Sequence, residues 1–368
     1  MAVYNVGGNR IDGSQKSMRS LADYGNLSTA AGFLSAFNAA VADMSICGVA
    51  IPYGEYTISA QLNMRSNFTV DGNGCKINGS GDHRIFRLID VDNCTIKNVN
   101  IDMHQTNSML DAALYVRDAN NISFEKITIE NIGGLGCLAY TTDEDIFMDN
   151  ISFKEVIMKG IGGSGQGSAS NAWERPCGII AVNCRDSIFE DCFVSGMKRF
   201  SLEFKNFSGD CHIVNNVVHG SMTGIALGGD ADESYDTLGY RIVIDGNVVS
   251  ESNYPLYLGR AGHLIVSNNY LDDGSLFIQG IHDCVLSGNI IRTTDISDVP
   301  TKSGEYWTRY ASIWIDGTCE NVHFLHNDYE TGENIPLIYV TQTADLDDFV
   351  INGYHEGELI NITDPTNT

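Results

Sequence analysis

Two charged residues in the middle of the chain have the types and spacing needed for acid–base chemistry. Glu203 and Lys205 alternate with apolar residues in "SLEFKN", and the acidic stretch "GGDADESYD" (228–236) follows. A glycoside hydrolase needs one protonated and one ionised carboxyl group about 5 to 10 Å apart. Glu203 and the acidic stretch can supply both, and Lys205 can hold one of them ionised. The predicted catalytic residues are Glu203, Lys205, Asp230, Asp232 and Glu233.

The acidic stretch has two other interpretations. Asp230, Asp232 and Asp236 match the first ligand positions of a calcium loop. However, Tyr235 replaces the glycine that such a loop needs for its turn, and Arg241 stands where the bidentate Glu belongs. A calcium site therefore remains an alternative to catalysis, as does a solvated acidic loop without a ligand.

Basic residues gather on either side of Glu203 in a chain with only 22 Lys and Arg. Arg175 lies in "NAWERPCG" (171–178), and Lys198 and Arg199 precede the segment of Lys205. They can bind the carboxylate of a uronate or sialate and provide a base for β-elimination, or they can simply neutralise nearby acids. A polysaccharide lyase is therefore the second candidate activity.

Aromatic residues near these groups can stack on sugar rings. For Phe277, packing against a neighbouring subunit is the alternative. The predicted substrate-binding residues are Trp173, Glu174, Arg175, Arg199, Tyr257, Arg260, Phe277, Trp307 and Trp314.

A repeated pattern must position these residues. "CTIKNVNI" (94–101) returns as "CHIVNNVV" (211–218) and "CVLSGNII" (284–291), each within a unit of about 22 residues that contains three alternating apolar segments. Such a unit is too short for helical repeats and suits a coil of three strands. We expect an all-β, single-stranded right-handed parallel β-helix of about ten coils. The predicted coil starts are Ile85, Leu114, Leu138, Ile179, Leu202, Ile225, Leu256, Leu276, Ile313 and Leu337.

Two residue types have fixed places in the repeat. Cys94, Cys211 and Cys284 share its first inward position, and no cysteine has metal-ligand spacing, so we expect buried thiols. Asparagines recur at one corner, where their amides can bond the bent backbone and one another, and Cys192 replaces one of them. The corner residues are Asn216, Asn247, Asn269, Asn289 and Asn327.

The alternation also predicts which residues point outward from the coils. Most are small or aromatic, and Glu203 with Lys205 is the charged exception. Long insertions bracket this face as walls of a groove, at 104–113, 160–178 and 293–312 before it and at 142–147 and 229–240 after it. The same alternation places Ala139 and Thr141 outward, and Ile180, Val182, Ile338 and Val340 on an exposed apolar face suited to self-association.

Composition and charge narrow the class of protein. The chain has 368 residues, 43% of them hydrophobic, and an elongated repeat can bury them in one domain. A net charge of −25 argues against nucleic acid and anionic membranes as partners. No signal peptide or membrane-length apolar run is evident, which predicts folding in a reducing cytoplasm, followed by association with a virion or release.

The N-terminal segment differs from the repeat. In "SLADYGNLSTAAGFLSAFNAAVADMSICGVAIPYGEYTIS" (20–59), Ser28 or Thr29 can cap a helix with Phe33 and Phe37 on one face, and Gly48 can start a strand. The expected divisions are a segment with a capping helix (1–60), the β-helix (61–361) and a tail (362–368).

The order of Asp-aromatic-Gly, Thr-Ala-Ala helix and "GVAIPYGEYTIS" resembles the pectate-lyase superfamily, especially phage tailspikes and polysaccharide depolymerases. The resemblance implies glycan chemistry on a homotrimeric rod. The polygalacturonase signature of Asn-Thr-Asp, paired Asp and Gly-His-Gly is absent, so the resemblance assigns no catalytic residue. Hydrolase, lyase and non-catalytic glycan-binding fibre all remain open, with no cofactor expected unless the acidic stretch binds calcium.

Overall fold

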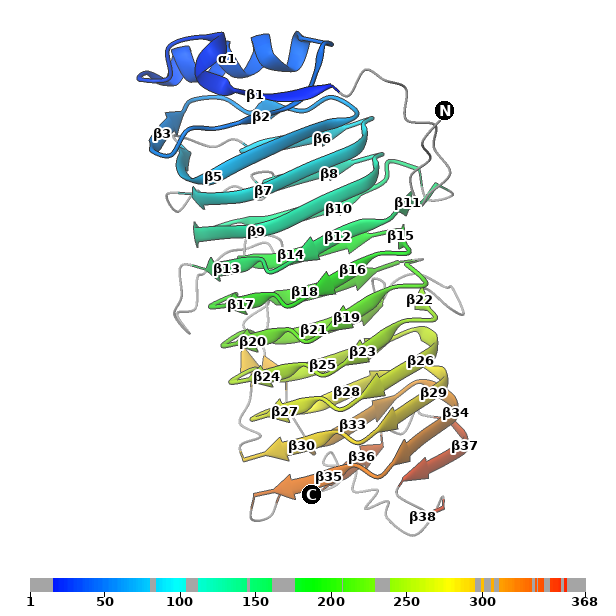
Figure 1. Cartoon of the computed structure of the whole chain (residues 1–368). Helices are drawn as coiled ribbons and strands as arrows, with labels where there is room; N and C mark the ends of the chain where they lie inside the picture. The colour runs from blue at the N-terminus through cyan, green and yellow to red at the C-terminus, as the bar shows by residue number, and fades with distance from the viewer. Residues whose placement is uncertain are drawn as a thin grey trace.

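The molecule is a rod of stacked coils with one helix at its N-terminal end (Figure 1). The computed structural model describes residues 16–79, 84–103, 112–143, 146–160, 176–206, 208–228, 239–294, 299–300, 306–307, 311–332, 335, 337–340, 345–351 and 354–355. Parallel strands from successive coils lie beside one another along the rod. The predicted parallel β-helix is confirmed.

One sheet of eleven parallel strands runs the length of the rod and carries five of the predicted site residues, Glu203, Lys205, Tyr257, Phe277 and Trp314. It has one strand more than the ten predicted coil starts, because β4 precedes the first of them. Its strands are β4 (Leu62–Asn63), β6 (Phe86–Ile89), β8 (Ala112–Arg117), β10 (Leu135–Tyr140), β14 (Cys177–Val182), β18 (Phe200–Lys205), β21 (Thr223–Gly228), β25 (Tyr254–Gly259), β28 (Leu276–Gln279), β33 (Ile313–Asp316) and β36 (Ile338–Val340).

The rest of each coil belongs to a sheet of 23 strands. In three coils one long strand, β5, β7 or β9, makes both remaining sides, and most other coils have two shorter strands there. Its strands are β1 (Ser17–Ser20), β2 (Ile46–Ala50), β3 (Glu55–Ile58), β5 (Phe68–Gly79), β7 (Asp92–Asp102), β9 (Asn120–Ile132), β12 (Ile151–Lys154), β13 (Ile157–Gly160), β16 (Ile188–Glu190), β17 (Phe193–Ser195), β19 (His212–Val214), β20 (Val217–His219), β22 (Gly239–Tyr240), β23 (Val243–Asp245), β24 (Val248–Ser250), β26 (Ala261–Ser267), β27 (Tyr270–Asp272), β29 (His282–Ser287), β30 (Ile290–Thr293), β34 (Thr318–Leu325), β35 (Asp328–Thr331), β37 (Asp345–Ile351) and β38 (Tyr354–His355). Two small sheets pair β11 (Met148–Asp149) with β15 (Cys184–Arg185) and β31 (Val299–Pro300) with β32 (Tyr306–Trp307).

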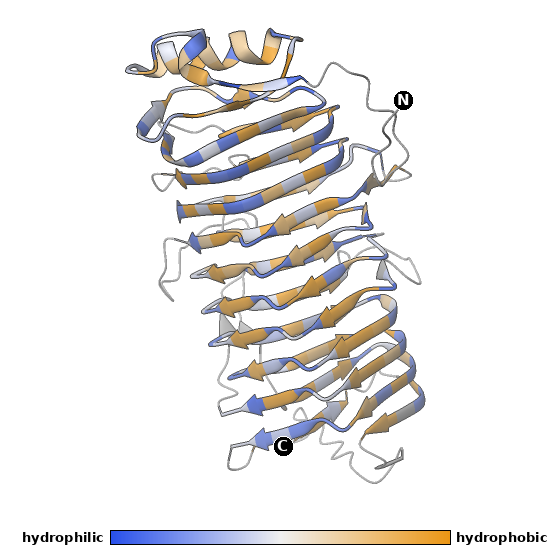
Figure 2. Ribbon diagram, viewed as in Figure 1, coloured by the Kyte–Doolittle hydropathy of each residue, from blue (hydrophilic) through white to orange (hydrophobic). Residues whose placement is uncertain are grey.

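Apolar residues of the two large sheets fill the inside of the coils, and Figure 2 shows the alternation of apolar and polar residues along the strands. Phenylalanines stack from coil to coil in this core. The rings of Phe124 and Phe153 lie 4.8 Å apart, and those of Phe189 and Phe204 lie 4.2 Å apart. Each coil therefore depends on its neighbours for burial, as a repeat protein requires.

Three predicted coil starts are wrong by one residue. Cys137, not Leu138, pairs with the inward residues Leu114 and Ile179. Strand β6 begins at Phe86 rather than Ile85, and β36 begins at Ile338 rather than Leu337. In each case two adjacent apolar residues let the alternation be placed in either register, and a shift of one residue reverses the faces.

These errors change which residues point outward. Ala139 and Thr141 are buried, and Leu138 and Tyr140 take the outward positions. Ile338 and Val340 belong to the core, and Ile180 is covered by its own neighbours. The predicted exposed apolar face is therefore wrong.

The corner asparagines form the predicted ladder. Nδ2 of Asn247 donates to Oδ1 of Asn269 at 2.9 Å and to the Ile213 carbonyl at 2.9 Å. Oδ1 of Asn247 accepts from the backbone and side-chain amides of Asn216 at 2.9 and 3.0 Å. The backbone N–H of Cys192 donates to Oδ1 of Asn216 at 2.9 Å, so the cysteine stands at the end of the ladder as predicted.

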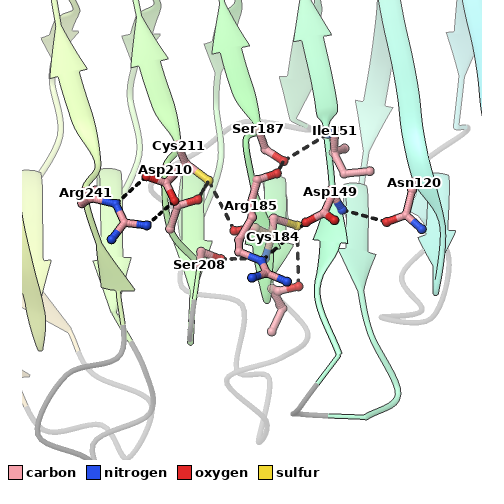
Figure 3. Close-up of polar contacts among 12 residues, drawn as sticks. Asn120, Asp149, Ile151, Cys184, Arg185, Ser187, Ser208, Asp210, Cys211 and Arg241 are labelled. Carbon is pink, nitrogen blue, oxygen red and sulfur yellow. Dashed lines mark hydrogen bonds and ion pairs between the residues drawn. The ribbon is translucent and has the colours of Figure 1, made fainter.

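Another corner has an irregular feature that the sequence analysis missed. At this corner, one residue of each coil has a positive φ, between 48° and 60°, and most of these residues are Asn or Asp, which tolerate that conformation. Side chains link this corner between coils, as Arg241 and Asp210 do in Figure 3. The residues are Asn67, Asn93, Asn121, Asn150, Asp186, Asp210, Arg241, His263, Asp283, Asn321 and Asp348.

The capping helix α1 (Ala30–Ala42) begins after Thr29, whose hydroxyl accepts from the Gly32 N–H at 3.0 Å. A short 3-10 helix, η1 (Leu21–Tyr24), precedes it. Phe33 and Phe37 are buried against the first coils, as predicted. Gly48 lies inside β2 rather than at its start. A Cβ at Gly48 would lie 2.3 Å from the Thr69 carbonyl oxygen.

All ten cysteines are free thiols, and only Cys47 is partly exposed. Burial raises the pKa of Cys75, Cys192 and Cys211 to about 12. The prediction that the repeat cysteines are buried is confirmed.

Candidate functional site

The outward-facing side of the eleven-stranded sheet, called here the outer face, brings predicted site residues from separate coils into one row. Cα pairing places Ile180, Glu203, Ala226, Tyr257, Phe277, Trp314 and Tyr339 on successive strands from β14 to β36. A second row, two residues further along the strands, contains Val182, Lys205, Gly228, Gly259, Gln279 and Asp316. The predicted outward positions from β14 to β33 are confirmed.

The C-terminal part of the outer face is aromatic. The rings of Tyr257 and Phe277 stack at 4.8 Å, and Phe277 meets Trp314 edge to face at 4.6 Å. Tyr254 adds a second edge contact with Phe277 at 6.2 Å. Phe277 is buried, whereas Tyr257 and Trp314 are partly exposed. Phe277 therefore supports the two neighbouring rings and is poorly placed to stack on a sugar itself.

Polar groups hold this aromatic part in place. The Tyr257 hydroxyl donates to Oε1 of Gln279 at 3.2 Å, and Nε2 of Gln279 donates to Oδ2 of Asp316 at 3.2 Å. The chain of bonds spans three adjacent coils. It fixes the orientation of the Tyr257 ring and presents polar atoms beside the aromatic surface.

Glu203 and Lys205 lie next to each other on β18, at the centre of the outer face. The side chain of Glu203 is buried, with Ile180 and Ala226 as its neighbours on the adjoining strands, and Lys205 is partly exposed. The Ser208 hydroxyl donates to the Lys205 carbonyl at 2.9 Å and thereby holds the end of β18.

Gly228, beside Lys205, keeps this part of the face open. A Cβ at Gly228 would lie 2.3 Å from the Gly259 carbonyl oxygen, and φ there is 129°. A side chain at this position would therefore displace the backbone next to Lys205.

A second carboxyl group for Glu203 does not come from the described part of this row. Asp316 is the nearest acid after Glu203 in the two rows, and it lies four strands away, which corresponds to about 19 Å at the usual strand spacing. That exceeds the range that glycosidases use. The predicted partners Asp230, Asp232 and Glu233 lie outside the described residues, as does Asp236 of the calcium alternative. The pairing with Glu203 and the calcium alternative both stay predictions.

The N-terminal part of the outer face is more basic and more tightly packed. The Arg84 guanidinium lies 3.6 Å from the centre of the Tyr115 ring, and the Tyr115 hydroxyl contacts that of Tyr140. Burial raises the pKa of Tyr115, and the hydrogen bond with Tyr140 is the second cause of the increase. Arg117 lies nearby at the end of β8, so positive charge adjoins aromatic rings here.

The predicted binding residues have mixed outcomes. The Arg199 guanidinium packs on the Phe200 ring at 4.6 Å, and Arg260 takes a corner position with φ of 48°. Trp307 lies in β32, and its side chain is not described. Trp173, Glu174 and Arg175, and most of the predicted wall insertions, lie outside the described residues.

A histidine pair escaped the sequence analysis. His263 and His282 lie with Asp283 at one corner of adjacent coils, although they are 19 positions apart in the chain. The pairing of β26 with β29 brings them together, and no local sequence motif indicates this pairing.

Within the described ranges, no helix has the length and apolar character needed to cross a membrane.

Comparison with solved structures defines the class of the fold. No family model matches this sequence, and no curated protein matches it. The fold is the right-handed parallel β-helix of pectin-lyase-like proteins.

Particular structures share it at low identity. The A-module of the Azotobacter vinelandii mannuronan C-5 epimerase AlgE4 matches with a TM-score of 0.67 and 15% identity, over 94% of this chain and all of that one. A family 28 exopolygalacturonase from Yersinia enterocolitica matches with a TM-score of 0.59 and 12% identity, over 93% and 79% of the two chains. PfbA, a surface adhesin of Streptococcus pneumoniae, matches with a TM-score of 0.54 and 11% identity, over 89% and 93%. At these identities the likeness concerns the fold.

Proposed function

We propose that this chain is a carbohydrate-active enzyme that binds a polysaccharide or oligosaccharide along its outer face and hydrolyses it near Glu203. The observation that supports this most is the row of Tyr257 and Trp314, held by Phe277 and leading toward Glu203. Tyr257 is two strands from Glu203, about 10 Å along the rod. A sugar stacked on Tyr257 would therefore place a neighbouring sugar close to the carboxyl group.

The hydrolytic mechanism assigns separate roles to the central residues. Glu203 acts as one member of the acid–base pair, and Asp230, Asp232 or Glu233 supplies the other. Lys205 favours the ionised form of the carboxyl nearer to it. One solved structure of similar fold is by its name an endo-xylogalacturonan hydrolase from Aspergillus tubingensis, which agrees with this proposal.

Lysis by β-elimination is the second candidate. Lys205 stands on the outer face, two residues from Glu203 on the same strand. A lysine amine can act as the base that removes the proton next to a uronate carboxylate. A role in glycan binding alone remains the third. Because the predicted exposed apolar face is wrong, the proposed homotrimer and the association with a virion rest on the tailspike resemblance alone.

Digestion of a panel of capsular and plant polysaccharides, followed by mass spectrometry, tests this function. Hydrolysis adds one water to each product pair, whereas a lyase leaves an unsaturated sugar that absorbs ultraviolet light. We expect Glu203→Gln, and Asp230→Asn or Asp232→Asn, to lower turnover by at least about a hundredfold. Glu190→Gln is the matched control, because Glu190 lies on β16 of the 23-stranded sheet and not on the outer face, and this variant should keep full turnover.

Three outcomes would contradict the proposal. Unsaturated products would replace hydrolysis by lysis. Full turnover in all three variants of a demonstrably active protein would move the site elsewhere. Retention of a glycan without any product would leave binding as the only role.

A further inference from the structure

Three potential metal ligands converge at one corner of the rod, on the paired strands β26 and β29. Nδ1 of His263 lies 3.4 Å from Oδ2 of Asp283, and Nδ1 of His282 lies 3.1 Å from the same oxygen. One ligand atom from each residue lies within 4.8 Å of the others. His263 is exposed and the other two are partly exposed, so ions from solvent can reach the cluster.

The two spacings between the histidines and the carboxylate suit a metal ion. Ligand atoms about 2.0 to 2.1 Å from a tetrahedral ion are separated from one another by about 3.4 Å. A histidine ring nitrogen offers a lone pair when the ring proton lies on its other nitrogen, and the carboxylate oxygen also offers one, so a cation can take the place of the protons between these three atoms. Imidazole with carboxylate is a donor set that first-row divalent ions such as zinc accept.

Neighbouring residues orient two of the three ligands. Nδ2 of Asn321, on the next coil, donates to Oδ1 of Asp283 at 2.6 Å and leaves Oδ2 directed at the histidines. The His282 ring lies over Gly262, where a Cβ would be 2.2 Å from the ring. The glycine thus provides the space that the ring occupies. An orienting amide behind a ligating carboxylate is typical of metal sites.

We propose that His263, His282 and Asp283 bind one first-row divalent metal ion of the zinc class. The ion joins two adjacent coils, because His263 lies on β26 and the other ligands lie on β29. Three protein ligands leave at least one coordination position for water. The site lies at the corner that follows the outer face, since His282 comes three residues after Gln279 in the chain.

Residues at the equivalent corner position of other coils indicate which substitutions the backbone accepts. His263 and Asp283 have φ values of 55° and 53°, and Asn occupies the equivalent position in other coils, for example Asn121 and Asn321. His263→Asn and Asp283→Asn therefore remove a ligand while keeping a residue that this backbone accepts. His282→Gln removes the third ligand.

The test uses the whole chain, freed of metal with a chelator, and isothermal titration with Zn²⁺. We expect one ion per chain at this site, and at least about a hundredfold weaker binding in each ligand variant. Asn321→Gly removes the orienting amide and keeps a residue that accepts the positive φ of 52°, and it should weaken binding by about tenfold, as loss of an orienting partner does. His219→Asn is the control, because His219 contacts one carboxylate, that of Glu251, and should leave binding unchanged.

A spectroscopic measurement separates this site from any other. Cu²⁺ bound to the intact protein should show electron paramagnetic resonance coupling to two imidazole nitrogens, and His263→Asn and His282→Gln should each reduce this to one. Zn²⁺ binding also raises the unfolding midpoint of the intact protein more than that of the ligand variants, because the ion binds only the folded corner. Absence of Zn²⁺ binding, or equal affinity in the intact protein and the variants, would overturn the proposal.

Discussion

Replacing Asn247 with alanine tests the energetic role of the corner ladder. The Asn247 side chain is fully buried, and its Oδ1 accepts the backbone N–H of Asn216. Alanine leaves this buried N–H without that acceptor, which costs about 1 to 3 kcal/mol. It also removes the two bonds that Nδ2 donates at 2.9 Å to Asn269 and Ile213, each worth about 1 kcal/mol. The sum is about 3 to 5 kcal/mol of lost stability.

Equilibrium denaturation followed by circular dichroism measures this loss. Asn100→Ala is the matched control, because Asn100 is exposed and its amide donates to the Gly74 and Cys75 carbonyls of the neighbouring strand β5. That variant should lose less than about 1 kcal/mol. If Asn247→Ala were no less stable than Asn100→Ala, the ladder would not be a source of stability, and the argument from buried amides would fail.

Three further predictions concern the cap and the core. Arg65→Ala should lower the free energy of unfolding by about 2 kcal/mol, because its guanidinium donates to the Val41 carbonyl in the last turn of helix α1 and to the Ile46 carbonyl at the start of β2; denaturation of the variant and the intact protein checks this, and equal stability of the two would contradict it. A thiol reagent at mildly alkaline pH should label only Cys47 in the native protein, since the other cysteines are buried, and mass spectrometry showing more than one fast label would refute this. Hydrogen bonds from Ser45, then from Tyr24, lower the pKa of Asp43 to about 2, so its contribution to stability should be present above about pH 4 and be lost as the pH falls toward 2; Asp43→Asn should remove that part of the pH dependence of the unfolding midpoint.

The repeat was predictable because its pattern is local. The alternation around Leu202 and Glu203 fixes one register, since a charged residue cannot occupy the inward position. At "LGCLAY" (135–140) both Cys137 and Leu138 are apolar, and the sequence alone does not choose between them. The pairing of Cys137 with Leu114 fixes the register, and that pairing exists only in the folded coils.

The site was predictable in part for the same reason. The outward positions of Tyr257 and Trp314 follow from alternation, whereas the burial of Phe277 depends on rings from the coils on either side of it. The histidine cluster depends on the lengths of the coils, because His263 reaches His282 only when one coil lies directly on the next. Long-range register is the information that the sequence alone did not supply.

A crystal structure of Glu203→Gln with a bound oligosaccharide would test the central proposal most directly. The variant should bind the glycan that the intact protein digests and cleave it slowly. Sugar rings should stack on Tyr257 and Trp314, and the scissile bond should lie within hydrogen-bond reach of residue 203. A glycan bound on the 23-stranded sheet, or on the outer face with its scissile bond away from residue 203, would contradict the proposed function.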